Sequence, residues 1–469
     1  MTGSAIDSLS FDLDSIASDD WHLQGIQFGL VDLNADRQAM TLSIEKMVLP
    51  KPFDKISLLD LKCNNLQLND DEIVCRQGVG IVKSPWLDST KVTVGFRISD
   101  SKKTLSIGNI KFAGGRVDIA AEYYQELWHL KLDGKAVELS KLNKLFKFEV
   151  VDVSSGQISL SVEAKLDASG LQQATLNAQL TDTMLQTQDG RYASEGLVCE
   201  FSLKVRRRGL RWSFDNEVRL TNGAVYFEPV FLELADTPVE FKAQGDWYEK
   251  SKRLGITDVS LKQQEVGAVL GRVDLDIEPE LLVNSANLNL TTTRLDNLSA
   301  IYLQPFLEAS AMDNLHFAGE ADAQIDVVQQ ILTGISVKFT ALDITDDEDK
   351  INLKGGEGFI NWTGLLSTES QSQVSWQQLK VFDIPIQTSA LSLTTDAGSL
   401  VLNQRAVLPV LGGNFNIEHF SWYQQQGQDP NVHFAGSIED VSLQQLSTVL
   451  EWQPLSGKIN GDKIGRAHV

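Results

Sequence analysis

The segment Gly334-Ile-Ser-Val-Lys-Phe-Thr-Ala-Leu-Asp343 alternates apolar and polar residues. Successive side chains in a β-strand point to opposite faces of the sheet, so the apolar residues of this segment should share one face and the polar residues the other. The predicted apolar face consists of Ile335, Val337, Phe339 and Ala341. Such a face needs a cover, which is either another layer of protein or an apolar ligand.

The same alternation recurs along the chain between short turn signals that contain Gly, Asn or Asp. Examples are Phe201-Ser-Leu-Lys-Val205, Val239-Glu-Phe-Lys-Ala243, Leu288-Asn-Leu290 and Leu391-Ser-Leu393, with turn signals such as Asn222-Gly223 and Gly245-Asp246. Repeated short strands with turns between them predict an all-β fold built on one long, twisted antiparallel sheet. A sheet of that length can fold into a sandwich, a barrel or a solenoid, or curl into an elongated hydrophobic groove.

Length and charge limit the architecture and the partners. The chain has 469 residues, which alone suggests about three domains. Because no Pro/Ser-rich linker or change of composition marks a boundary, we expect residues 1–463 to form one continuous β-array. The formal net charge is −22, which argues against nucleic acid as a partner, since phosphates attract Lys and Arg. We attribute the acidity mainly to the solubility of a large exposed surface.

The last six residues, Ile464-Gly-Arg-Ala-His-Val469, match one reading frame of a widely used short-read sequencing adapter. We interpret residues 464–469 as an adapter artefact, exclude them from the fold prediction, and expect the natural chain to continue beyond Asp462. The start of the chain shows neither a basic nor an apolar leader segment, and no run approaches the roughly 20 apolar residues that cross a bilayer.

Three cysteines are too few for a disulfide scaffold and lack the spacing of a zinc site. Cys63 and Cys75 flank a segment that a hairpin would fold back on itself, which would bring them within disulfide reach. Alternatively, both are isolated apolar core residues. Cys199 is left single in either case.

A unit of strand, glycine and short helix recurs. Residues 128–134 run into Val137-Glu-Leu-Ser-Lys-Leu142, and residues 432–436 run into Val441-Ser-Leu-Gln-Gln-Leu446. Each is predicted to be a strand followed by a short helix, and in the second the apolar spacing changes from two to three and four, which indicates that transition. A looser copy at residues 295–307 precedes Leu315-His-Phe-Ala-Gly319. Recurring units of this kind are typical of extended arrays.

Motifs that carry chemistry are missing from the sequence. There is no phosphate-binding loop, dinucleotide fingerprint, zinc-protease motif or nucleophile elbow. The acidic run Asp346-Asp-Glu-Asp349 lacks the alternation of a calcium loop and is predicted to be a hairpin tip. The basic run Arg206-Arg-Arg208 can touch anionic lipid headgroups, but a turn between Leu203 and Trp212 explains it as well. We therefore predict no catalytic residues, no metal site, no cofactor and no enzymatic activity.

The glycine-terminated strands, the Val-x-Leu-x-x-Leu helix starts, and the segments Leu408-Pro-Val-Leu-Gly-Gly413 and Pro454-Leu-Ser-Gly-Lys-Ile-Asn-Gly461 resemble the AsmA-like superfamily of Gram-negative envelope proteins (AsmA/TamB/YhdP-type), most closely its YdbH-like branch. The resemblance spans roughly residues 21–462. It implies a periplasmic β-groove that carries phospholipids between the inner and outer membranes, in contact with envelope proteins of both. It also implies an inner-membrane anchor helix at the N-terminus, which this sequence does not contain.

Acyl chains exposed to water cost about 0.8 kcal/mol per CH₂, so an apolar groove would bind them while the headgroup stays in solvent. The residues expected to line the groove are Phe241, Leu288, Leu290, Val337, Phe339, Leu391 and Leu393. An ordinary sandwich core would use the same residues. Two other functions stay open: a β-rich cell-surface adhesin or structural protein, which needs a filled coil, and a polysaccharide-active β-enzyme, which needs a polar cleft with aromatic rings and facing acids.

Overall fold

A computed structural model describes residues 7–18, 21–34, 38–49, 56, 58–146, 150–308, 310, 312–364, 369–396, 399–423 and 431–468. The chain divides into two compact units. Unit 1 comprises Met1–Glu228 and Glu233–Ala235, and unit 2 comprises Pro229–Leu232 and Asp236–Val469. The described residues form thirty strands of one antiparallel sheet with a few short helices, which confirms the predicted all-β fold.

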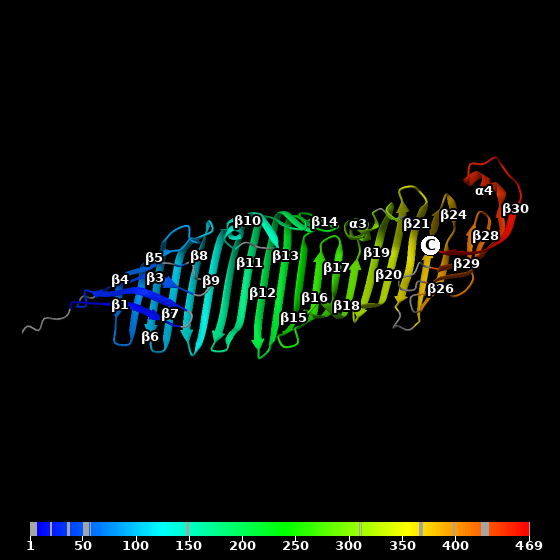
Figure 1. Cartoon of the computed structure of the whole chain (residues 1–469). Coiled ribbons are helices and arrows are strands. Elements are labelled where there is room, and N and C mark those ends of the chain that lie inside the picture. The colour runs from blue at the N-terminus through cyan, green and yellow to red at the C-terminus, as the bar shows by residue number, and fades with distance from the viewer. Residues whose placement is uncertain are drawn as a thin grey trace, which may run out of the picture. The chain divides into compact units, whose positions relative to one another are not determined.

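Unit 1 is a succession of hairpins in which each strand pairs with the next, and β6 to β13 run side by side in Figure 1. Its elements are β1 (Ser8–Ala17), β2 (His22–Val31), β3 (Gln38–Val48), β4 (Leu58–Leu68), β5 (Glu72–Lys83), β6 (Lys91–Ser99), β7 (Lys102–Phe112), β8 (Gly115–Tyr124), β9 (Leu127–Glu138), α1 (Leu139–Phe146), β10 (Val151–Asp167), β11 (Gly170–Thr187), β12 (Tyr192–Arg208) and β13 (Arg211–Phe227). The short strand β14 (Val230–Glu233) falls across the division between the units.

Unit 2 continues the hairpin pattern, but three of its later strands are each broken into two pieces, β22/β23, β24/β25 and β26/β27. Its elements are β15 (Val239–Tyr248), β16 (Arg253–Gln263), β17 (Gly267–Asp276), β18 (Leu282–Thr292), α2 (Leu295–Leu298), the π-helix η2 (Ser299–Leu303), α3 (Gln304–Leu307), β19 (Leu315–Val328), β20 (Ile331–Asp346), β21 (Ile351–Thr363), β22 (Ser370–Trp376), β23 (Gln378–Val381), β24 (Ile384–Ile386), β25 (Ser389–Asp396), β26 (Ser399–Leu402), β27 (Ala406–Val410), β28 (Gly413–Tyr423), β29 (Asn431–Ser442), α4 (Leu443–Val449) and β30 (Lys458–His468).

Bulges interrupt the strand pairing in both units. Five of them coincide with a non-glycine residue at positive φ between 48° and 58°, namely Asn109, Ala136, Asp182, Ala341 and Asp440. A bulge bends its strand and increases the local twist. Bends of this kind are the local geometry that a curled sheet requires.

Helices begin in both segments where they were predicted, at Leu139 and Leu443, and the looser copy forms α2, η2 and α3. The glycines Gly134 and Gly436 do not end their strands, because β9 and β29 continue beyond them. The bulge at Ala136 or Asp440, three residues before the helix, makes the turn instead.

The two best-matched helical units agree in detail. The backbone N–H of Ala136 donates to Ser159 Oγ (3.1 Å), and that of Asp440 donates to Asn460 Oδ1 (2.7 Å). In each unit the acceptor lies three residues after a glycine, Gly156 or Gly457. The φ angles of Gly156, Gly319 and Gly457, one after each helical segment, are 119°, 118° and 120°. The chain therefore repeats one helix-bearing module, twice in detail and once in a looser form.

One residue of the opening segment departs from its predicted face. Ala341 was expected to join Ile335, Val337 and Phe339, but it has φ 50° and lies in a register shift between Phe339 and Leu342. Leu342 then pairs with Gly356. The bulge adds a residue that the alternation alone does not reveal.

Candidate functional site

The apolar residues of unit 2 form continuous rows across the strands. One row passes through β15, β16, β17, β18, β19, β20 and β21 by direct cross-strand pairing. Its members are Phe241, Leu261, Val269, Leu290, Ala323, Val337 and Ile360. The neighbouring row contains Ala243, Val259, Gly271, Leu288, Ile325, Ile335 and Trp362. We call the face that carries these rows, in either unit, the apolar face.

All seven residues predicted to line a groove lie on the apolar face. Phe241, Leu290 and Val337 share the first row, and Leu288 belongs to the second. The remaining three are joined to the same face by pairing: Phe339 pairs with Gly358, Gly358 with Val374 and Val374 with Leu391, two residues before Leu393. Phe339 is buried, with 5% of its surface exposed, whereas the other six are half-buried. Their contact with a ligand stays a prediction.

Unit 1 carries an equivalent row that the sequence prediction did not name. It runs from β6 to β13 through Phe96, Leu105, Ala121, Leu130, Ala164, Ala174, Val205 and Phe214. The alternation that identified the residues of unit 2 is also present here, and it could have found this row.

Large side chains on the apolar face stand partly in solvent. Leu105 is 42% exposed, Leu130 38%, Ile119 37% and, in unit 2, Ile360 42%. A sandwich core would bury such residues almost completely. Within the described part of each unit, these side chains therefore have no second layer of protein over them.

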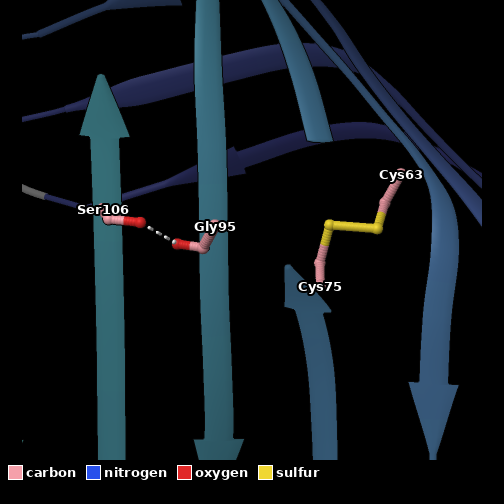
Figure 2. Close-up of a disulfide and its surroundings, with 4 residues drawn as sticks. All are labelled: Cys63, Cys75, Gly95 and Ser106. Carbon is pink, nitrogen blue, oxygen red and sulfur yellow. Dashed lines mark hydrogen bonds between the residues drawn. A yellow bond between two sulfur atoms is a disulfide. The ribbon is translucent and has the colours of Figure 1, made fainter. Parts of the chain in front are cut away.

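A disulfide anchors the apolar face near its N-terminal end. Cys63 of β4 and Cys75 of β5 are joined, with their Cα atoms 6.2 Å apart (Figure 2). Both are buried with Met40 and Leu66 in a small cluster on which Phe28 and Phe96, among others, pack. The two strands form the hairpin that the intervening sequence suggested. On the neighbouring strands, Ser106 Oγ donates to the Gly95 carbonyl at 3.2 Å (Figure 2).

The opposite face of unit 1 is polar and hollowed. Hollows of about 620 and 690 Å³ share Arg76 and Lys131 in their linings. The first also contains Glu122 and Glu163, but neither Trp nor Tyr lines it. Lys131 forms an ion pair with Glu163 at 3.4 Å. Because the acids there are paired with bases and no Trp or Tyr ring is present, this hollow does not match the cleft that polysaccharide hydrolysis requires.

Reactive groups are sparse in the described part of the chain. No group of three His, Cys, Asp or Glu residues there is placed to hold a metal ion. Cys199 is buried, and burial raises the pKa of its thiol, which disfavours the nucleophilic thiolate. The acidic run at residues 346–349 forms the hairpin tip between β20 and β21.

One charge pair at a hairpin of unit 2 influences stability. The guanidinium of Arg253 donates to both carboxylate oxygens of Asp274, one of them at 2.6 Å. This hydrogen bonding holds the pKa of the Asp274 carboxyl below its usual value.

Helices of the described segments are all too short to cross a membrane. Comparison with protein-family models and with curated proteins finds no match to this chain.

Proposed function

We propose that this chain is part of a periplasmic lipid-conduit protein that carries phospholipids between the inner and outer membranes, without enzymatic activity. Acyl chains lie against the apolar face, and the headgroups stay in solvent. The observation that carries this proposal is the apolar face of each unit, on which Leu105, Ile119, Leu130 and Ile360 are 37% to 42% exposed.

The energetics favour such a ligand. Each acyl CH₂ removed from water contributes about 0.8 kcal/mol. The half-exposed leucines and isoleucines of the face gain burial from the same contact. A continuous face has no barrier that confines a lipid to one strand, so movement along it is passive and its direction is set by the partners at each membrane.

Two further features agree with this location and family. The Cys63–Cys75 disulfide fits an oxidising compartment such as the periplasm. The recurring helix-bearing module agrees with the AsmA-like resemblance, which supplies the proposed inner-membrane anchor and the envelope partners.

The test is mass spectrometry of organic extracts from protein purified in minimal detergent. We compare the parent with Leu105→Asp/Leu130→Asp, which places two carboxylates on the apolar face. The matched control is Ser106→Asp/His129→Asp, which places them on the polar face of the same strands. We expect phospholipid in the parent and the control and a marked loss in the apolar-face variant.

Circular dichroism verifies that all three proteins fold. A folded parent that carries no phospholipid contradicts the proposal, as does an apolar-face variant that carries as much as the control.

A further inference from the structure

Cations and aromatic rings meet at one edge of the apolar face in unit 1. We call this edge the hairpin margin: it consists of the strand ends beside the turns β6–β7, β8–β9, β10–β11 and β12–β13, at the opposite end of the strands from α1. Lys103 Nζ lies over the ring of Tyr123, 5.7 Å from its centroid, and that ring lies 5.0 Å from Trp128. The guanidinium of Arg207 lies over Trp212, 5.5 Å from the ring centroid.

Strand register places these residues on the apolar face. Lys103 pairs with Tyr123, which pairs with Trp128, and Arg207 pairs with Trp212. Each cation therefore stands over an aromatic ring at the end of the apolar face.

The turn between β12 and β13 is locally basic. The span from Arg207 to Arg211 contains three arginines and no acid, in a chain of formal net charge −22. The nearby carboxyl of Asp167 is held by hydrogen bonds from Ser169, which lower its pKa, and the charge of Arg207 lowers it further. Arg207 also donates to the carbonyl oxygens of Gly209 (3.0 Å) and Ser169 (3.1 Å), which orients the guanidinium.

Unit 2 independently shows the same combination. Lys252, in the turn between β15 and β16, lies over Trp247 at 6.0 Å from the ring centroid. Trp247 pairs with Leu254 on the apolar face. A cation over an aromatic ring thus recurs at a hairpin end of the apolar face.

We propose that the hairpin margin binds the phosphate of anionic phospholipid headgroups. This proposal rests on the proposed lipid-conduit function. Guanidinium and ammonium groups pair with phosphate oxygens. Trp and Tyr are the side chains that settle at the boundary between apolar chains and polar headgroups. A lipid with acyl chains on the apolar face and headgroup at this margin satisfies both requirements.

The experiment measures binding of acyl-labelled fluorescent phosphatidylglycerol and of phosphatidylcholine with the same chains, near 0.15 M salt. The test variant is Lys103→Glu/Arg207→Glu. Its matched control is Lys102→Glu/Arg206→Glu, which changes the net charge equally on the adjacent residues of the polar face. Lys103→Gln/Arg207→Gln removes the two charges without reversing them, and it replaces the first variant in the binding measurement if that variant does not fold.

Each charge near a lipid surface contributes about 1 kcal/mol, about fivefold in affinity, so removing two should weaken phosphatidylglycerol binding by about 25-fold. We expect phosphatidylcholine binding to change little and the control to resemble the parent.

Equal losses in the test variant and the control, or no preference for phosphatidylglycerol in the parent, overturn the headgroup assignment but do not contradict the proposed lipid-conduit function. Failure of the parent to bind either lipid contradicts the conduit itself. Displacement of the labelled lipid by excess inorganic phosphate alone would assign the margin to free anions and overturn the lipid assignment.

Discussion

The clearest test of the uncovered face compares two leucines of unit 1. Leu66 is completely buried, whereas Leu105 is 42% exposed. Leu66→Ala should cost about 2–5 kcal/mol of unfolding free energy, because it removes apolar contacts and leaves a cavity. Fully burying a leucine is worth about 1.5–3 kcal/mol, so Leu105→Ala, at a site only partly buried and open to solvent, should cost about 1 kcal/mol.

Lipid should change this ranking. Urea unfolding of both variants is measured with lipid-free protein and with protein loaded with phosphatidylglycerol. An acyl chain over Leu105 buries the exposed part of its side chain, so the cost of Leu105→Ala should rise towards about 2 kcal/mol in the loaded protein. The cost of Leu66→Ala should not change. Equal costs for the two substitutions in lipid-free protein would refute the reasoning, because they would show that protein already covers Leu105.

Three other predictions concern stability. Replacing Cys63 and Cys75 by serine should lower the unfolding free energy by about 3 kcal/mol, the loop-closure value for their separation of 12 residues, as measured by urea unfolding; no loss would contradict a native disulfide. Gly156→Ala should destabilise the fold more than Gly457→Ala, as measured by hydrogen exchange of the neighbouring strands. Both glycines have φ near 120°, but an added Cβ would lie 2.8 Å from the backbone of Thr183 at the first site and 3.5 Å from a methyl group of Leu443 at the second. Equal effects would show that the φ angle alone sets the cost. Folding lowers the pKa of the Asp274 carboxyl, so this group contributes stability that is present above its unfolded pKa, near 4, and is lost as pH falls through the folded pKa. Asp274→Asn should therefore reduce the dependence of the melting temperature on pH in that range. A melting temperature that depends on pH as in the parent would contradict the pairing with Arg253.

The two faces of the sheet could be predicted in unit 2 because alternation with period two holds in the strands that carry the row residues. Phe241, Leu290 and Val337 lie far apart in the sequence, yet cross-strand pairing brings them into one row. Each was assigned from its own strand alone. The pairing adds only the register, which hairpins between successive strands fix.

What the sequence could not reveal depends on bulges and on pairing between strands. Ala341 left its predicted face because an extra residue in the strand reverses the alternation after it. The pairing of Cys63 with Cys75 stayed open because spacing does not show whether two side chains share a face. The Arg207–Trp212 contact was missed because the basic run looked like an ordinary turn, and only the register places the ring beneath the cation.

The recurring helix-bearing module suggests how a sheet of this kind can become longer by duplication. A globular core limits growth, since new strands must find a place around a filled centre. A sheet extended hairpin by hairpin has no such limit. The strands between α3 and α4 occupy about eight successive positions in the sheet, counting each broken strand once. At about 4.8 Å per strand, they would lengthen a sheet by roughly 40 Å. Duplication of whole modules therefore lengthens such a sheet in steps of a few nanometres without rebuilding a core.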